Sequence, residues 1–117
     1  ITAGLEGIDE IHQFRSTHGD FQSSYYCKSI VLQGGVESKR VEIIQELAAQ
    51  GVGTSIYYPR PIPELTYYTE KYGFEPGRFP NAAKIAYQSI ALPVGPHLEE
   101  GDAYHVANTV KKVLRNY

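Results

Sequence analysis

Residues 51–63 constrain the fold of this chain more than any other stretch, because a short apolar run leads directly into three prolines at alternate positions. The stretch reads Gly-Val-Gly-Thr-Ser-Ile-Tyr-Tyr-Pro-Arg-Pro-Ile-Pro. Proline fixes φ, removes a backbone donor and disfavours helical geometry in the residue before it. We therefore expect extended backbone at Tyr58, Arg60 and Ile62. The sequence predicts a strand over 52–58 that ends in a rigid loop presenting two tyrosines and an arginine.

Two further strands and a helix are predicted from composition and spacing. Residues 24–32 are rich in aromatic and β-branched side chains and precede Gln-Gly-Gly, which is typical of a strand and a turn. Residues 89–94 predict a strand that the prolines at 93 and 96 should end. A helix is expected to begin at Ser38 and to stop at Gly51. Helical spacing predicts its buried face as Val41, Ile44, Leu47 and Ala48.

Three more helices follow along the chain. One is expected over 64–71, before Gly73, and a short one from Pro80, because proline favours the first helical turn. The last helix is the clearest, since acidic residues crowd its start and basic residues its end, which matches the helix dipole. Its predicted core stripe is Ala103, Val106, Ala107, Val110, Val113 and Leu114.

This order of elements predicts an α+β fold, a small open sheet of about three strands with helices packed on one face. Residues 1–22 are polar with scattered glycines and are expected to be a connector, and residues 23–117 to be the domain itself. The chain of 117 residues, 42% of them hydrophobic, suits a single core. It opens at Ile1 and contains no methionine, so we expect that a preceding segment or domain was removed.

The overall charge and hydropathy exclude several classes of function. A total of 11 Lys and Arg against 13 Asp and Glu gives a formal charge of −2, which provides no electrostatic footprint for nucleic acid or an anionic membrane. No apolar run approaches the roughly 20 residues that a membrane span requires. We therefore expect a soluble, cytoplasmic protein with no nucleic-acid or membrane partner.

Metal binding and nucleophilic catalysis lack a motif. None of the four histidines has a partner at ligand spacing: His12, His18, His97 and His105. His105 is expected to pack or to lie at the rim of the core, and the single cysteine, Cys27, to be a small buried apolar residue. No P-loop or Gly-x-Ser-x-Gly turn occurs, and we nominate none of the six lysines as a Schiff-base lysine. We assign no metal ligand and no catalytic residue.

Four blocks of this sequence resemble the small C-terminal domain of DegT/DnrJ/StrS-type nucleotide-sugar aminotransferases, which are fold-type I enzymes that use pyridoxal phosphate. The blocks are 24–32, the helix end Leu-Ala-Ala-Gln-Gly at 47–51, residues 52–61, and residues 77–84 running on to 90–96. In order and spacing the likeness covers essentially all of 3–117. The chain departs from the family where His-Tyr-Pro often stands, since it has Tyr57-Tyr58-Pro59, and it lacks a His near Pro63 and a Glu near Ala83.

The resemblance implies a mainly antiparallel sheet and a role in amino-sugar biosynthesis for a surface polysaccharide or natural product. The full-length enzyme would move an amino group from glutamate onto a nucleotide-linked keto-sugar, with pyridoxal phosphate as cofactor, and would act as a homodimer. The cofactor lysine of such enzymes lies in an N-terminal domain that has no counterpart here. The resemblance therefore implies no catalytic or cofactor-binding residue in this chain, which would be inactive alone.

The resemblance also implies that Tyr57 and Tyr58 lie beside the substrate cleft. Their hydroxyls and rings are candidate contacts for the sugar or phosphates, and Arg60 is a candidate partner of the diphosphate. On the alternative interpretation Arg60 is solvated, and one tyrosine of each adjacent pair packs in the core while the other lines a surface. Two alternative functions also remain at this point: a small binding module, and a non-catalytic sugar-sensing descendant of the enzyme.

Overall fold

The computed structural model describes all 117 residues. The strands are β1 (Ile11–Gln13), β2 (Thr17–His18), β3 (Phe21–Gln22), β4 (Lys28–Leu32) and β5 (Ser89–Leu92), and the helices are α1 (Arg40–Ala49), α2 (Thr66–Tyr72), α3 (Pro80–Gln88) and α4 (Glu100–Leu114). Short 3-10 turns cover Ala3–Leu5, Glu37–Lys39 and Ile62–Glu64. The chain therefore has the α+β composition that the sequence predicts.

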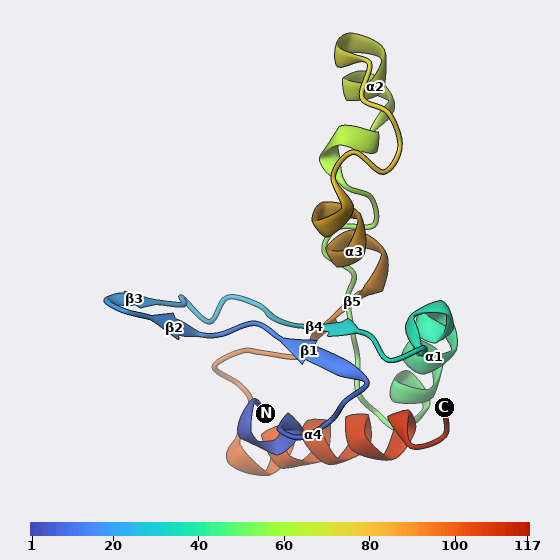
Figure 1. Cartoon of the computed structure of the whole chain (residues 1–117). Helices are drawn as coiled ribbons and strands as arrows, with labels where there is room; N and C mark the ends of the chain where they lie inside the picture. Colours follow the sequence, from blue (N-terminus) through green and yellow to red (C-terminus); the bar gives the residue numbers. More distant parts are fainter.

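The central sheet has three antiparallel strands in the order β1-β4-β5. Ile11 lies opposite Leu32, and Ile30 lies opposite Ile90. Helices α1 and α4 pack together, and Figure 1 shows α4 running along one side of the sheet. The main core lies between these helices and the sheet, where Leu47 and Val110 join the strand side chains. The predicted fold class, with helices on one face of a small antiparallel sheet, is confirmed.

The strand predicted over 52–58 is wrong, because this segment pairs with the sheet at a single residue. The Ser55 and Ala91 backbones exchange two hydrogen bonds, of 3.0 and 2.8 Å, and no ladder continues from them. The prolines that follow at 59, 61 and 63 lack the backbone N–H groups that a longer ladder would require. The third strand of the sheet is instead β1, and the strand predicted over 24–32 begins only at Lys28.

Residues 1–22 contribute to the fold more than a connector requires. Leu5 and Ile11 are buried members of the core, and β1 forms one edge of the sheet. Burial of two aliphatic side chains stabilises the domain by about 1.5–3 kcal/mol each. That this segment also joins a preceding domain stays a prediction.

Helix α1 has a different buried face from the predicted one. Ile43 and Leu47 are buried and Ile44 is half-buried, whereas Val41 is 61% exposed and Ala48 is exposed. Val41 lies two residues before Ile43, about 200° around the helix, and therefore on the opposite side. Ser38 belongs to the preceding 3-10 turn and makes no capping hydrogen bond. The predicted stop is confirmed, since Gly51 has a φ of +83°.

The remaining helices agree with the sequence. Helix α2 ends at the left-handed Gly73 and α3 begins with Pro80 in its first turn. In α4 the predicted stripe is buried except for the half-buried Ala103. Glu99 and Asp102 cap this helix reciprocally, and the Glu99 backbone N–H donates to the Asp102 carboxylate at 2.9 Å. Local capping and apolar spacing thus determine where these helices begin and end.

The molecule is extended for its length. Its Cα radius of gyration is 15.6 Å, whereas a compact chain of this length has a radius of about 13 Å. Figure 1 shows the reason: the β2–β3 hairpin projects from one side of the sheet, and α2 and α3 project in another direction. We call these the hairpin arm (residues 14–27) and the helical arm (residues 56–88). Both carry large exposed apolar side chains.

Candidate functional site

The proline-containing loop leaves the sheet immediately after the Ser55 bridge and presents its two tyrosines outward. The ring centroids of Tyr57 and Tyr58 lie 6.2 Å apart with the planes tilted by 56°. Tyr57 is 49% exposed and Tyr58 is 75% exposed. Neither hydroxyl bonds to another residue of the chain, so both can donate to or accept from a ligand. The peptide bond between the two tyrosines is cis.

The three residues predicted from the sequence line one cavity. Tyr57, Tyr58 and Arg60 face a volume of about 260 Å³ at the start of the helical arm. The rest of the wall is apolar and comes from the loop and from α3: Pro61, Ile62, Ala82, Ile85 and Ala86. Binding sites for complete small ligands usually occupy about 300–1,000 Å³. The cavity is therefore smaller than the usual site for a complete ligand, and its wall combines three polar side chains with an apolar remainder.

A second cavity opens on the other side of Tyr57. It has a volume of about 450 Å³, and its wall includes Tyr26, Thr54, Ser55 and Pro93. Tyr57 lines both cavities and so forms the ridge between them. A ligand that spans this ridge would contact the Tyr57 ring and the loop hydroxyls together.

A hydrogen bond between two elements fixes the loop against α3. The Tyr87 hydroxyl donates to the carboxylate of Glu64, which lies in the 3-10 turn just after the prolines. This bond raises the pKa of Tyr87, while the positive charge of Arg60 nearby lowers it. Sequence reasoning missed both residues. They lie 23 positions apart in the chain, and neither belongs to a motif that would pair them.

The interpretation that one tyrosine of each adjacent pair packs in the core is wrong. No member of the pairs 25–26, 57–58 and 67–68 is buried. Tyr68 instead stacks on Tyr72 at a centroid distance of 6.1 Å, and Tyr72 stacks on Phe74 at 5.6 Å. These rings form a small cluster of their own at the tip of the helical arm. The twin tyrosines fall outside the strands, where no alternation between two faces applies.

The other candidate groups occupy ordinary positions. Cys27, predicted to be buried, is half-buried with its Sγ 3.3 Å from the Ser29 Oγ, because β4 begins just after it. His105 lies at the rim, as predicted, with its Nε2 3.1 Å from the Gln50 carbonyl oxygen. No three His, Cys, Asp or Glu side chains lie close enough to share a metal ion. None of the four helices has the length and hydropathy to cross a bilayer.

Comparison with known proteins identifies the chain's relatives. The sequence model of the DegT/DnrJ/EryC1/StrS aminotransferase family matches residues 1–111. The erythromycin biosynthesis sensory transduction protein EryC1 of Saccharopolyspora erythraea is 39% identical over 72 residues, which cover 62% of this chain and 19% of that protein. The dTDP-3-amino-3,4,6-trideoxy-alpha-D-glucose transaminase of Streptomyces venezuelae is 35% identical over 74 residues, covering 63% of this chain and 19% of the transaminase.

Solved structures share the fold. The putative sugar aminotransferase Spr1654 of Streptococcus pneumoniae aligns with 97% of this chain at a TM-score of 0.82 and 28% identity, and the alignment covers 28% of that protein's chain. The matched part of this chain therefore covers 19–28% of the length of these relatives.

Proposed function

Because this chain belongs to the DegT/DnrJ/EryC1/StrS aminotransferase family, we propose that it is the small C-terminal domain of a pyridoxal-phosphate-dependent aminotransferase acting on a nucleotide-linked keto-sugar. In this proposal residues 1–22 lead from an N-terminal domain, and residues 23–117 form one wall of the substrate cleft. The observation that carries it is the loop cavity, where Tyr57, Tyr58 and Arg60 converge beside an apolar floor.

The loop residues would position the sugar nucleotide and exclude water. A phenolic hydroxyl bonds equally well to a sugar hydroxyl or a phosphate oxygen, and its ring covers an apolar face of the ligand. The guanidinium of Arg60 offers paired donors to a diphosphate. The clamp between Glu64 and Tyr87 holds the loop against α3, so these groups would be placed before the substrate arrives. The contribution of this domain is therefore positional.

Pyridoxal phosphate does not fit the residues of this chain alone. The cofactor needs a lysine, a group that pairs with its ring nitrogen and donors for its phosphate in one site. Four of the six lysines are exposed, and the other two, Lys28 and Lys111, each line a cavity. The single carboxylate at the Lys28 cavity is that of Glu99, which caps α4. In the proposed enzyme the cofactor, which supplies the electron sink for amino transfer, is held by the N-terminal domain.

The wider setting follows from the same proposal. The amino donor would be glutamate, the enzyme would act as a cytoplasmic homodimer, and its product would enter a surface polysaccharide or a natural product. The Streptomyces venezuelae relative carries the name of a sugar transaminase, which supports this class of substrate.

The test uses the full-length product of the gene and its two half-reactions. Cofactor bound to a lysine should give a visible absorbance band that borohydride abolishes. Tyr58→Phe and Arg60→Gln should slow amino transfer to the nucleotide-linked sugar at least tenfold and leave the glutamate half-reaction unchanged. Tyr104→Phe, on an exposed position of α4, is the matched control. Equal losses in both half-reactions would contradict the assignment of the loop to the sugar side.

One relative favours a second candidate, a protein that recognises sugars without catalysis. EryC1 is described as a sensory transduction protein. A full-length product that binds a nucleotide sugar but gives no cofactor band would support this candidate over the aminotransferase.

A further inference from the structure

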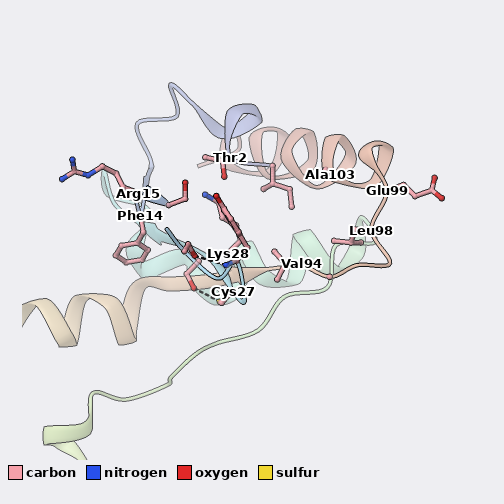
Figure 2. Close-up of a pocket in the computed structure, with 15 residues that line it drawn as sticks. Thr2, Phe14, Arg15, Cys27, Lys28, Val94, Leu98, Glu99 and Ala103 are labelled. Atoms are coloured by element: carbon pink, nitrogen blue, oxygen red, sulfur yellow. Dashed lines mark hydrogen bonds between the residues drawn. The ribbon is translucent and has the colours of Figure 1, made fainter. Parts of the chain in front are cut away.

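A cavity of about 440 Å³ lies between the sheet, the base of the hairpin arm and the start of α4. Figure 2 shows it in close-up, with residues from all three parts around it. Its apolar wall includes Phe14, Val94, Leu98 and Ala103. The volume falls within the range of about 300–1,000 Å³ that is usual for small-molecule sites. The cavity shares only Cys27 and Val94 with the one behind Tyr57.

Lys28 places a positive charge at this cavity without an anion beside it. The side chain is half-buried, and its Nζ donates to the neutral amide oxygen of Gln13 at 2.7 Å. Burial lowers the pKa of Lys28, because removal from water disfavours the ammonium form. The single ion pair of the chain, between Lys39 and Glu42, lies elsewhere. The Lys28 ammonium therefore retains capacity for a negatively charged partner.

The charged side chains of Glu99 and Arg15, which also line the cavity, do not pair with Lys28. Glu99 accepts a hydrogen bond from the first turn of α4, which its side chain caps. Figure 2 shows the Glu99 carboxylate and the Arg15 guanidinium extending to opposite sides, away from the other labelled residues. Lys28 thus provides a cation without an anionic partner beside apolar side chains of the wall. A ligand with a single negative charge would be compensated there.

We propose that this cavity binds a small amphipathic carboxylate, whose carboxylate pairs with the Lys28 ammonium and whose hydrocarbon body lies against Phe14, Val94 and Leu98. The Ser29 hydroxyl, which also lines the cavity, can donate to the second carboxylate oxygen. The proposal rests on the cavity and its charge, and it stands independently of the aminotransferase assignment.

The probe is hexanoate, titrated into the 117-residue chain and followed by amide chemical shifts. Hexanol and hexylammonium are the neutral and cationic controls. We expect saturable shifts centred on Lys28, Leu98 and Ala103 with hexanoate, and at least tenfold weaker binding of both controls. Hexanoate should also move the titration of the Lys28 side chain, followed at its Cε, to higher pH, while hexanol should not. Equal binding of hexanol and hexanoate would overturn the proposal.

A pair of variants separates the charge of Lys28 from charge in general. Lys28→Met should weaken hexanoate binding at least tenfold, and Lys112→Met, at an exposed position on α4, should leave it unchanged. Unchanged binding by Lys28→Met would also overturn the proposal. If Lys28→Met fails to fold, the comparison of the three ligands on the unmodified chain still decides the question.

Discussion

At the scale of single residues, Gly4 and Gly101 differ in the space around their missing side chains. A Cβ at Gly4 would lie 2.7 Å from the Cβ of Ala107, a contact too short to form without movement of α4. A Cβ at Gly101, in the first turn of α4, would meet nothing within 4 Å. The close approach of the N-terminal segment to α4 thus depends on glycine at position 4.

We expect Gly4→Ala to lower the free energy of unfolding by about 1–3 kcal/mol, because overpacking forces a backbone shift. Gly101→Ala should raise it by up to about 1 kcal/mol, since alanine loses less entropy in a helix. Urea unfolding followed by circular dichroism measures both changes. A neutral Gly4→Ala would contradict the contact between the N-terminal segment and α4.

Tyr117, at the end of the chain, makes stability depend on pH in the alkaline range. Its hydroxyl donates to the Glu46 carboxylate at 2.5 Å, and this bond raises the pKa of Tyr117 to about 12. Because the folded pKa lies above the unfolded value of about 10, the stabilisation by this bond is complete below pH 10 and is lost as the pH rises through about 12.

An alkaline titration of tyrosinate absorbance should therefore show a late component, near pH 12, that belongs to Tyr117. Tyr117→Phe should remove that component, and Glu46→Gln should shift it to lower pH. A late component that survives in Tyr117→Phe would show that another tyrosine produces it.

At the scale of elements, the hydrogen bond between Tyr87 and Glu64 joins α3 to the turn after the prolines. We expect Tyr87→Phe to loosen this turn without unfolding the core, because the side chain is exposed and belongs to the helical arm. Amide exchange at Glu64 and Leu65, which bond to Pro61 and Ile62, should become at least severalfold faster. Exchange at the buried Val110 should not change. Uniform acceleration at all three amides would indicate a global effect and would contradict the clamp.

The helices were predictable from the sequence because their signals are local. Gly51 and Gly73 supply left-handed stops, and Pro80 supplies a first turn, within the segments they delimit. The strands depended on partners far along the chain. The apolar run 52–58 reads as a strand, yet Ser55 meets β5 at one point only, while the polar-looking Ile11–Gln13 pairs fully with β4.

The candidate site likewise contains some residues that share a local sequence signal and others that do not. Tyr57, Tyr58 and Arg60 share one loop of alternating prolines, and all three line one cavity. The supporting pair, Glu64 and Tyr87, joins different elements and carries no local signal. The same holds for the Lys28 cavity, whose walls come from the N-terminal segment, the hairpin arm and the start of α4. Assemblies of distant residues require the fold before they can be identified.

At the scale of the whole molecule, the two arms present apolar surface that nothing in this chain covers. On the hairpin arm Phe21 is 79% exposed and Tyr26 is 83% exposed. Such surface is unusual for a free monomer and marks contact regions. In the proposed enzyme the arms would pack on the N-terminal domain or on a second subunit. The isolated chain has neither, so its arms should pack on those of other copies.

We expect the 117-residue chain to self-associate with increasing concentration, and the radius of gyration from X-ray scattering should rise above the monomer value. The double variant Phe21→Ser and Tyr26→Ser should shift association to at least fivefold higher concentration, because it removes the apolar tips of the hairpin arm. Tyr104→Ser, 62% exposed on α4, changes a comparable area away from the arms and should have little effect. A chain that stays monomeric at millimolar concentration would oppose this prediction. If Tyr104→Ser weakened association as much as the arm variant, the contact would lie on α4 instead, and the arms would need another explanation for their exposed rings.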